Sequence, residues 1–247
     1  MSLFSIYYEF ILLESMINTP AVTGEFVGTY IMMTLGLGIS VIINYFLYPN
    51  GQSRYLTGFY WGISIWIASM IGTGIWNTAN FNPLFSIAQG LNQQITWSVV
   101  IGEIMVQILA TWLASATVHR IWKHWLITLP LNLNFFATVP RRFNHNWYNF
   151  FWEAGGTALI TINAQLLPLA NLPWWVNVTW SSIVMFILIT IVAPITGAAF
   201  NPTRDLVPRE YFSFLISHDY AQWNYAIVPL MGPIVGCGLV MIIKLLI

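Results

Sequence analysis

Charged residues are scarce in this sequence. Only 6% of its 247 residues are Asp, Glu, Lys or Arg, whereas 57% are hydrophobic and 16% are aromatic. A soluble domain carries about 25% charged residues, which cover its surface. The eight basic residues are matched by eight acidic ones, so the chain also lacks the positive surplus that attracts nucleic acid. These shortages argue against a soluble enzyme, a disordered protein or a nucleic-acid binder, and they predict an integral protein of the lipid bilayer.

Cysteine and histidine are equally sparse. The one cysteine, Cys237, lies in an apolar run and has no partner for a disulfide bond. A nucleophile–base pair or a metal cluster inside the membrane would need such residues within the apolar stretches. We therefore expect no catalytic residue, no metal, no cofactor and no intramembrane enzyme. The four histidines all lie outside the predicted spans, at His119, His124, His145 and His218.

Long apolar stretches occur six times. A helix needs about 20 apolar residues to cross about 30 Å of hydrocarbon. The segment from Met1 to Pro20 differs, because it carries Glu9 and Glu14 without Lys or Arg, and we expect a short cytoplasmic or interfacial helix there rather than a signal peptide. The six predicted spans are residues 23–47, 57–76, 96–118, 149–168, 176–195 and 223–246.

Two further segments, 81–91 and 200–215, are too apolar for exposed loops and too short to span a bilayer. They have the character of re-entrant half-helices. Each opens with an Asn-Pro pair, Asn82–Pro83 and Asn201–Pro202. Asn is a favoured N-cap and Pro is favoured in the first turn, so both pairs predict helix starts.

The chain also repeats itself. The pattern Glu-x-x-Gly-Thr occurs at Glu25 and again at Glu153, and each copy is followed by a span and then by an Asn-Pro half-helix. Three spans with one half-helix, present twice, predict two halves inverted in the membrane. We place these repeats at about 20–118 and 147–247, joined by a loop at 119–146, within a single channel domain of residues 1–247.

These features resemble the major intrinsic protein family, the aquaporins and glycerol facilitators, over nearly the whole chain. The two Asn-Pro pairs correspond to the family's paired Asn-Pro-Ala signatures. Residues 201–209 (NPTRDLVPR), 136–140 (FATVP) and 228–236 (VPLMGPIVG) are similar to the glycerol-facilitator branch. The resemblance implies an all-α membrane protein with six transmembrane helices, two re-entrant half-helices and an inverted 3+3 repeat.

The resemblance also implies roles for the pore residues. Asn82 and Asn201 would cap their helices and donate hydrogen bonds to a passing oxygen, and Arg204 would line the narrowest constriction. A structural alternative makes Arg204 a surface residue paired with Asp205. Carried over by position, the selectivity constriction comprises Trp61, Ile189, Ala198 and Arg204, a ring that is similar to that of plant nodulin-like channels. Strict spacing from Asn82 would select Gly62 in place of Trp61.

Three acidic residues are assigned to the scaffold of the re-entrant loops. Glu25 and Glu153 lie within spans, where a charge is costly unless it is partnered, so we expect them to accept hydrogen bonds from the loop backbone. Asp205 would steady the loop around Arg204. The chain departs from the family at several positions: Leu84 and Thr203 replace Ala, Asn80 replaces His, Thr78 replaces Gly and Glu103 replaces Gln.

The predicted function is a passive channel for glycerol, water and other small neutral solutes. A water-selective aquaporin and a poorly conducting structural member of the family are the alternatives, the second because Leu84 and Ile189 are bulky. Family resemblance implies a homotetramer in the cell membrane with both termini cytoplasmic. The positive-inside rule indicates the opposite orientation, because segment 119–149 holds half of all Lys and Arg.

Overall fold

The computed structural model describes residues 20–43, 47, 53–126, 133–141 and 145–246. The expected helix before Pro20 and the end of the first predicted span, residues 44–46, lie outside the described residues. The described residues form helices and connecting loops without a strand. The six long helices are α2 (Pro20–Ile42), α3 (Arg54–Trp76), α5 (Trp97–Leu126), α6 (Asn146–Leu166), α7 (Trp174–Thr196) and α9 (Trp223–Leu246).

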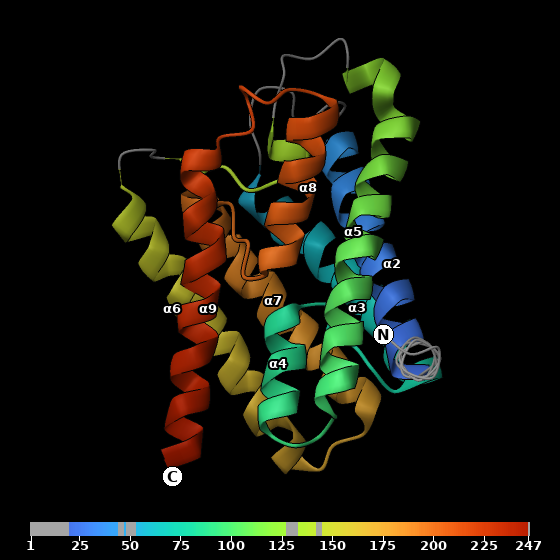
Figure 1. Cartoon of the computed structure of the whole chain (residues 1–247), viewed down its shortest axis with the longest axis vertical. Helices are drawn as coiled ribbons and strands as arrows, with labels where there is room; N and C mark the ends of the chain where they lie inside the picture. Colours follow the sequence, from blue (N-terminus) through green and yellow to red (C-terminus); the bar gives the residue numbers. More distant parts are fainter. Residues whose placement is uncertain (1–19, 44–46, 48–52, 127–132, 142–144, 247) are drawn as a thin grey trace, which may run out of the picture.

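The two short helices coincide with the predicted half-helices. They are α4 (Pro83–Leu91) and α8 (Pro202–Leu215). In Figure 1 they lie one above the other, α4 in the lower part of the bundle and α8 in the upper part. Short 3₁₀ turns occur at Leu133–Phe135 and Leu167–Ala170. The all-α fold with two half-helices is therefore confirmed.

The third span is longer than the sequence pattern predicted. The expected end was residue 118, but α5 continues to Leu126 because neither Gly nor Pro interrupts the segment, and Lys123 and His124 lie in its last turn, where positive charge is favourable. His119 and His124 consequently lie within this helix, in the part that continues past the predicted end of the span. At 1.5 Å per residue α5 is about 45 Å long, more than the hydrocarbon core requires.

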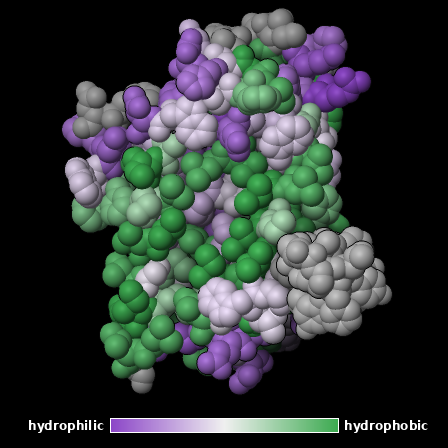
Figure 2. All heavy atoms as spheres, in the orientation of Figure 1, coloured by the Kyte–Doolittle hydropathy of each residue, from purple (hydrophilic) through white to green (hydrophobic). Residues whose placement is uncertain are grey.

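Five of the long helices are long and apolar enough to cross a membrane by length and composition alone. The sixth, α6, is less apolar because Asn149, Glu153, Thr157 and Thr161 recur every fourth residue along it. All four are buried, so this polar stripe faces the interior of the bundle. Figure 2 shows the hydrophobic side chains gathered over the middle of one face, with hydrophilic side chains concentrated toward its two ends.

The packing of the helices follows the repeat. In the first half α2 packs against α5 and α3, and in the second half α6 packs against α9 and α7. The halves meet along α3 and α7, while α4 contacts α9 and α8 contacts α5. Both half-helices therefore pack against α5 of the first half and α9 of the second half.

Candidate functional site

Both half-helices begin at an Asn that caps its own helix. The Asn82 side-chain oxygen accepts a hydrogen bond from the Leu84 amide at 3.1 Å. The Asn201 oxygen accepts from the amides of Thr203 and Arg204 at 3.0 and 3.3 Å. Both Asn residues have extended backbone and a Pro follows each, as the capping preferences predict.

The side-chain amide of each Asn donates a hydrogen bond to a backbone carbonyl in the loop of the other half. Asn82 Nδ2 donates to the Phe200 carbonyl at 3.0 Å, and Asn201 Nδ2 donates to the Phe81 carbonyl at 2.7 Å. These crossed bonds join the N-termini of α4 and α8. Each amide group carries two hydrogens, so one hydrogen on each Asn is left for another acceptor.

The Gly of each Glu-x-x-Gly-Thr repeat makes room for the aromatic ring that precedes an Asn. A Cβ atom added to Gly28 would lie 2.1 Å from the Phe81 ring, and one added to Gly156 would lie 2.2 Å from the Phe200 ring. Phe81 and Phe200 have left-handed backbone, with φ of 48° and 53°. Sequence reasoning noted the repeated Gly but did not find its partner, because these contacts join residues more than 40 positions apart.

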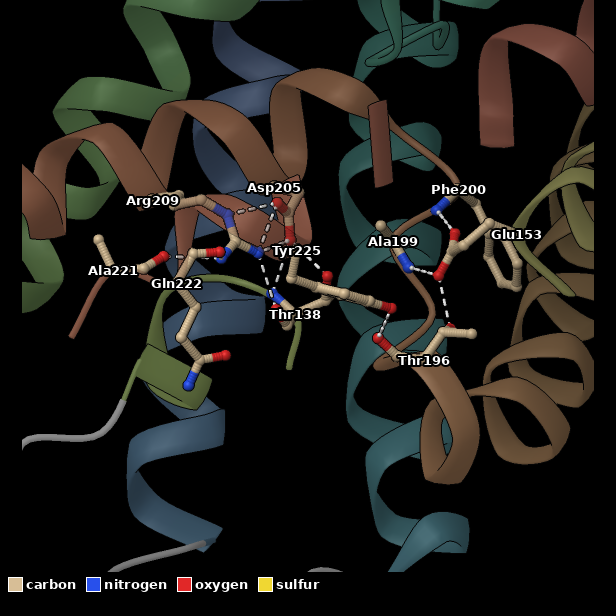
Figure 3. A network of polar contacts seen from close by, with 10 residues as sticks. All are labelled: Thr138, Glu153, Thr196, Ala199, Phe200, Asp205, Arg209, Ala221, Gln222 and Tyr225. Carbon is tan, nitrogen blue, oxygen red and sulfur yellow. Dashed lines mark hydrogen bonds and ion pairs between the residues drawn. The ribbon is translucent and has the colours of Figure 1, made fainter. Parts of the chain in front are cut away.

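Glu25 and Glu153 hold the two loops in matching ways. Glu25 accepts from the amides of Asn80 and Phe81, both at 2.7 Å. Glu153 accepts from the amides of Ala199 and Phe200 at 3.0 and 2.9 Å, as Figure 3 shows.

A Thr hydroxyl also donates to each of these two carboxylates, from Thr78 in the first half and from Thr196 in the second. Both carboxylates are fully buried, so each has its desolvation offset by these bonds. Gln107 also donates to Glu25 at 2.8 Å.

Two cavities flank the joined N-termini. The larger, of about 570 Å³, is lined by both capping Asn residues and by polar side chains of α3, α4, α6 and α7. The smaller, of about 230 Å³, is lined by Trp61, Tyr60, Arg204, Asn134 and residues 137–141. Arg204 lies three residues after Asn201, so the helix start at α8 contributes to both cavities.

Arg204 and Trp61 face each other in the smaller cavity. The Arg204 guanidinium carbon lies 4.4 Å from the Trp61 ring centroid. The Nη1 atom of Arg204 is buried and has no hydrogen-bond partner among the described residues. Gly62 lies instead against Phe186 of α7, where an added Cβ would approach to 3.0 Å. Five residues separate the end of α3 from Asn82, and four separate the end of α7 from Asn201.

Ile189 and Ala198 occupy a different environment from Arg204. Both are buried, and both belong to the same packed hydrophobic cluster as Trp61. Neither is among the residues that line the two cavities. The structure therefore brings Trp61 and Arg204 together at a cavity wall and places the other two predicted constriction residues in the packed cluster around Trp61.

The partner of Asp205 is Arg209 and not Arg204. The two side chains are both fully buried, with 2.8 Å between Arg209 Nη2 and Asp205 Oδ1. Asp205 also accepts from the Thr138 amide at 2.7 Å, and Arg209 donates to the carbonyls of Thr138 and Ala221, both at 2.8 Å. Figure 3 shows this network joining α8 to the segment around Thr138. The alternative of an Arg204–Asp205 surface pair was wrong. Sequence reasoning quoted Arg209 only as part of a motif, although its i,i+4 spacing from Asp205 was a usable signal.

Leu84 does not line the larger cavity. It packs instead in a buried cluster with Ala88, Cys237 and Met241, between α4 and α9. Its added bulk relative to Ala thus fills the contact between two helices, and it does not narrow the space around Asn82 and Asn201.

This chain is similar to a protein-family model, to individual relatives in sequence and to a solved structure in fold. The sequence model described as major intrinsic protein matches residues 13–243. The glycerol uptake facilitator protein of Bacillus subtilis is 28% identical over 222 residues, covering 86% of this chain and 79% of the relative. Aquaporin NIP1-1 of Zea mays is 27% identical, covering 87% of this chain and 71% of the relative. The X-ray structure of the aquaglyceroporin from Plasmodium falciparum is similar in fold, with a TM-score of 0.80 and 19% identity over 90% of this chain and 93% of that one.

Proposed function

Because this chain belongs to the major intrinsic protein family, we propose that it is a passive channel for glycerol and other small neutral solutes, with water able to pass. The observation that carries the proposal is the pair of half-helices that meet N-terminus to N-terminus through the crossed bonds of Asn82 and Asn201. The arrangement gives two amide donors in one cavity and Arg204 in the other. Relatives named as glycerol uptake facilitators support glycerol as the solute.

Selectivity in this proposal comes from the wall that Trp61 and Arg204 form. The indole face offers an apolar surface, while the Arg204 guanidinium, which lines the same cavity, offers N–H donors. A polyol has carbon on one side and hydroxyls on the other, so it matches both surfaces. In the proposed constriction Ile189 and Ala198 complete the apolar side behind Trp61. A channel selective for water alone would not need this apolar wall.

Exclusion of ions follows from the same geometry. The N-terminal ends of α4 and α8 carry partial positive charge and point at the molecular centre, and the Arg204 guanidinium adds a full charge. Cations and protons would be repelled by all three. Glu25, Glu153 and Asp205 act as scaffold in this proposal, because their oxygens are occupied by loop amides, hydroxyls and Arg209.

We propose the following arrangement in the cell membrane. The halves 20–118 and 147–247 form one domain with opposite orientations, so both ends of the chain lie on the same side, as cytoplasmic termini. The protein assembles as a homotetramer, in the manner of the family. The basic segment that includes Arg120, Lys123 and Arg141 then faces outward, and reporter tags on either side would decide the orientation.

The test is stopped-flow light scattering on proteoliposomes, with an impermeant osmolyte and then with a glycerol gradient. We expect fast re-swelling in glycerol for the wild type and its loss in Ala193→Trp, because Ala193 lines the smaller cavity with Trp61 and Arg204 and the indole would fill that space. The matched control is Gly238→Trp, since a Cβ added at Gly238 meets no atom within 4 Å. Water flux without glycerol flux would make the protein a water-selective aquaporin, and the absence of both fluxes would make it a poorly conducting member of the family. Either result would overturn the proposal.

A further inference from the structure

The side chain of Asn80 breaks the symmetry between the two half-helix loops. The Asn80 amide donates to Glu25 just as the Ala199 amide donates to Glu153, so the two residues occupy equivalent backbone positions. Ala199 has only a methyl group there, whereas Asn80 adds a carboxamide. Asn80 lines the larger cavity together with Asn82 and Asn201.

The orientation of the Asn80 carboxamide is determined by two neighbouring acceptors. Its Nδ2 atom donates to Gln89 Oε1 of α4 and to Glu103 Oε2 of α5, both at 3.0 Å. A carboxamide has two N–H hydrogens, and these two bonds use both. Rotating the group by a half turn would place its oxygen against two acceptor oxygens and would lose both bonds.

The oxygen of Asn80 is consequently the atom left for the cavity. Oδ1 accepts no hydrogen bond from the described residues, and it is not among the buried side-chain atoms that lack a partner. Glu103 is buried, with 1% of its surface exposed, and the Ser86 hydroxyl hydrogen-bonds to its carboxylate. Its acceptor atom is thereby held in place behind Asn80.

We infer that Asn80 Oδ1 is an acceptor subsite for solute O–H and N–H groups, and that Gln89 and Glu103 are the residues that position it. Asn82 and Asn201 each offer an N–H donor to the same cavity, so a hydroxyl can accept from one of them and donate to Asn80. The subsite favours polyols and other neutral solutes that carry donors and acceptors together. The inference rests on the proposed channel function. It assigns a solute contact to Asn80 in the first half, whereas the equivalent residue of the second half, Ala199, has no side-chain acceptor.

The test measures the ratio of glycerol to water permeability in proteoliposomes for four variants. Asn80→Leu removes the acceptor with little change of volume, and Glu103→Met removes one anchor of the amide. We expect each to lower the ratio about fivefold, the factor that corresponds to one neutral hydrogen bond. Water is less affected because it re-forms its bonds with other water molecules in a cavity of about 570 Å³. The ratio does not depend on how much protein is reconstituted.

Two further variants separate positioning from a structural role. Glu103→Gln keeps an oxygen that can accept from Asn80 Nδ2, so we expect its ratio to stay within about twofold of the wild type. The double variant Asn80→Leu with Glu103→Met should show no loss beyond Asn80→Leu alone, because Glu103 acts through Asn80. Additive losses in the double variant, or a loss in Glu103→Gln equal to that in Glu103→Met, would overturn the positioning role.

The two proposals fail in different ways. If the wild type conducts no glycerol, the channel function itself is wrong. If the wild type conducts glycerol and Asn80→Leu has the same glycerol-to-water ratio, the acceptor subsite is wrong and the channel function stands. Thermal unfolding of each detergent-solubilised variant identifies any loss of fold before the fluxes are compared.

Discussion

The guanidinium group of Arg204 lies over the indole ring of Trp61, with 4.4 Å between the Arg204 Cζ atom and the ring centroid. A cation over an aromatic face is attracted by the ring quadrupole, and the attraction is stronger where water is excluded. The contact holds a long flexible side chain in one orientation at the wall of the smaller cavity. Loss of the indole should therefore change both the width of the smaller cavity and the position of the Arg204 guanidinium that lines it.

Removal of the Trp61 ring should weaken the preference for glycerol. We expect Trp61→Ala to lower the ratio of glycerol to water permeability about fivefold, because both the apolar wall and the support of Arg204 are lost. Stopped-flow light scattering on proteoliposomes measures both fluxes. The matched control is Trp147→Ala, since Trp147 is 77% exposed on α6. An unchanged ratio in Trp61→Ala would remove this residue from the constriction.

The tight contact between Gly156 and Phe200 should make that glycine intolerant of a methyl group. An added Cβ would lie 2.2 Å from the Phe200 ring, so Gly156→Ala must displace the ring or α6. Overpacking of this kind costs about 1–3 kcal/mol, and we expect a lower unfolding temperature in detergent together with reduced glycerol flux. Gly155→Ala is the control, because a Cβ at Gly155 meets nothing within 4 Å. Equal effects of the two substitutions would contradict the assigned role of the repeat glycine.

The buried pair of Asp205 and Arg209 should behave as a unit. Asp205→Asn leaves the Arg209 charge buried without its carboxylate, and we expect a loss of stability of about 3–5 kcal/mol. Asp219→Asn is the control, since the Asp219 side chain is 94% exposed. The double variant Asp205→Leu with Arg209→Met should be more stable than Asp205→Asn, because no unpaired charge remains. Thermal unfolding followed by circular dichroism compares the three; a double variant less stable than the single one would argue against the pair as the source of the loss.

Leu84 should affect stability and leave conduction intact. It packs against Cys237 and Met241 and does not line the larger cavity. Leu84→Ala would restore the residue typical of the family but would leave a void between α4 and α9, at a cost of about 2–5 kcal/mol. We expect a lower unfolding temperature with glycerol flux within about twofold of the wild type, a change of less than about 0.5 kcal/mol in the barrier. A large rise in flux would mean that Leu84 does narrow the path.

Local signals in the sequence were sufficient to place the half-helices. Asn82–Pro83 and Asn201–Pro202 predicted helix starts within a residue, because capping depends on side chains that are adjacent in the chain. The repeated Glu-x-x-Gly-Thr pattern indicated two equivalent halves, and the structure shows both Glu residues bound to loop amides.

Local sequence patterns could not predict the contacts between segments that lie far apart in the chain. The Thr138–Asp205 bond joins residues 67 positions apart, and the crossed Asn bonds join residues about 120 apart. The direction in which Leu84 points depends on how α4 rotates against α9, which no local pattern determines. The end of α5 was missed for a different reason: four charged or His residues interrupt the apolar run after residue 118, but the helix continues through them to Leu126.

We propose that the two joined half-helices form a path for glycerol and exclude ions. Glycerol efflux and proton leak can be recorded from the same proteoliposomes, by light scattering and by an encapsulated pH-sensitive dye. We predict fast glycerol flux with a proton leak no greater than that of empty liposomes, because the N-terminal ends of α4 and α8 and the Arg204 charge repel protons. Glycerol flux no faster than in empty liposomes, or a proton leak that rises with the amount of protein, would contradict the account.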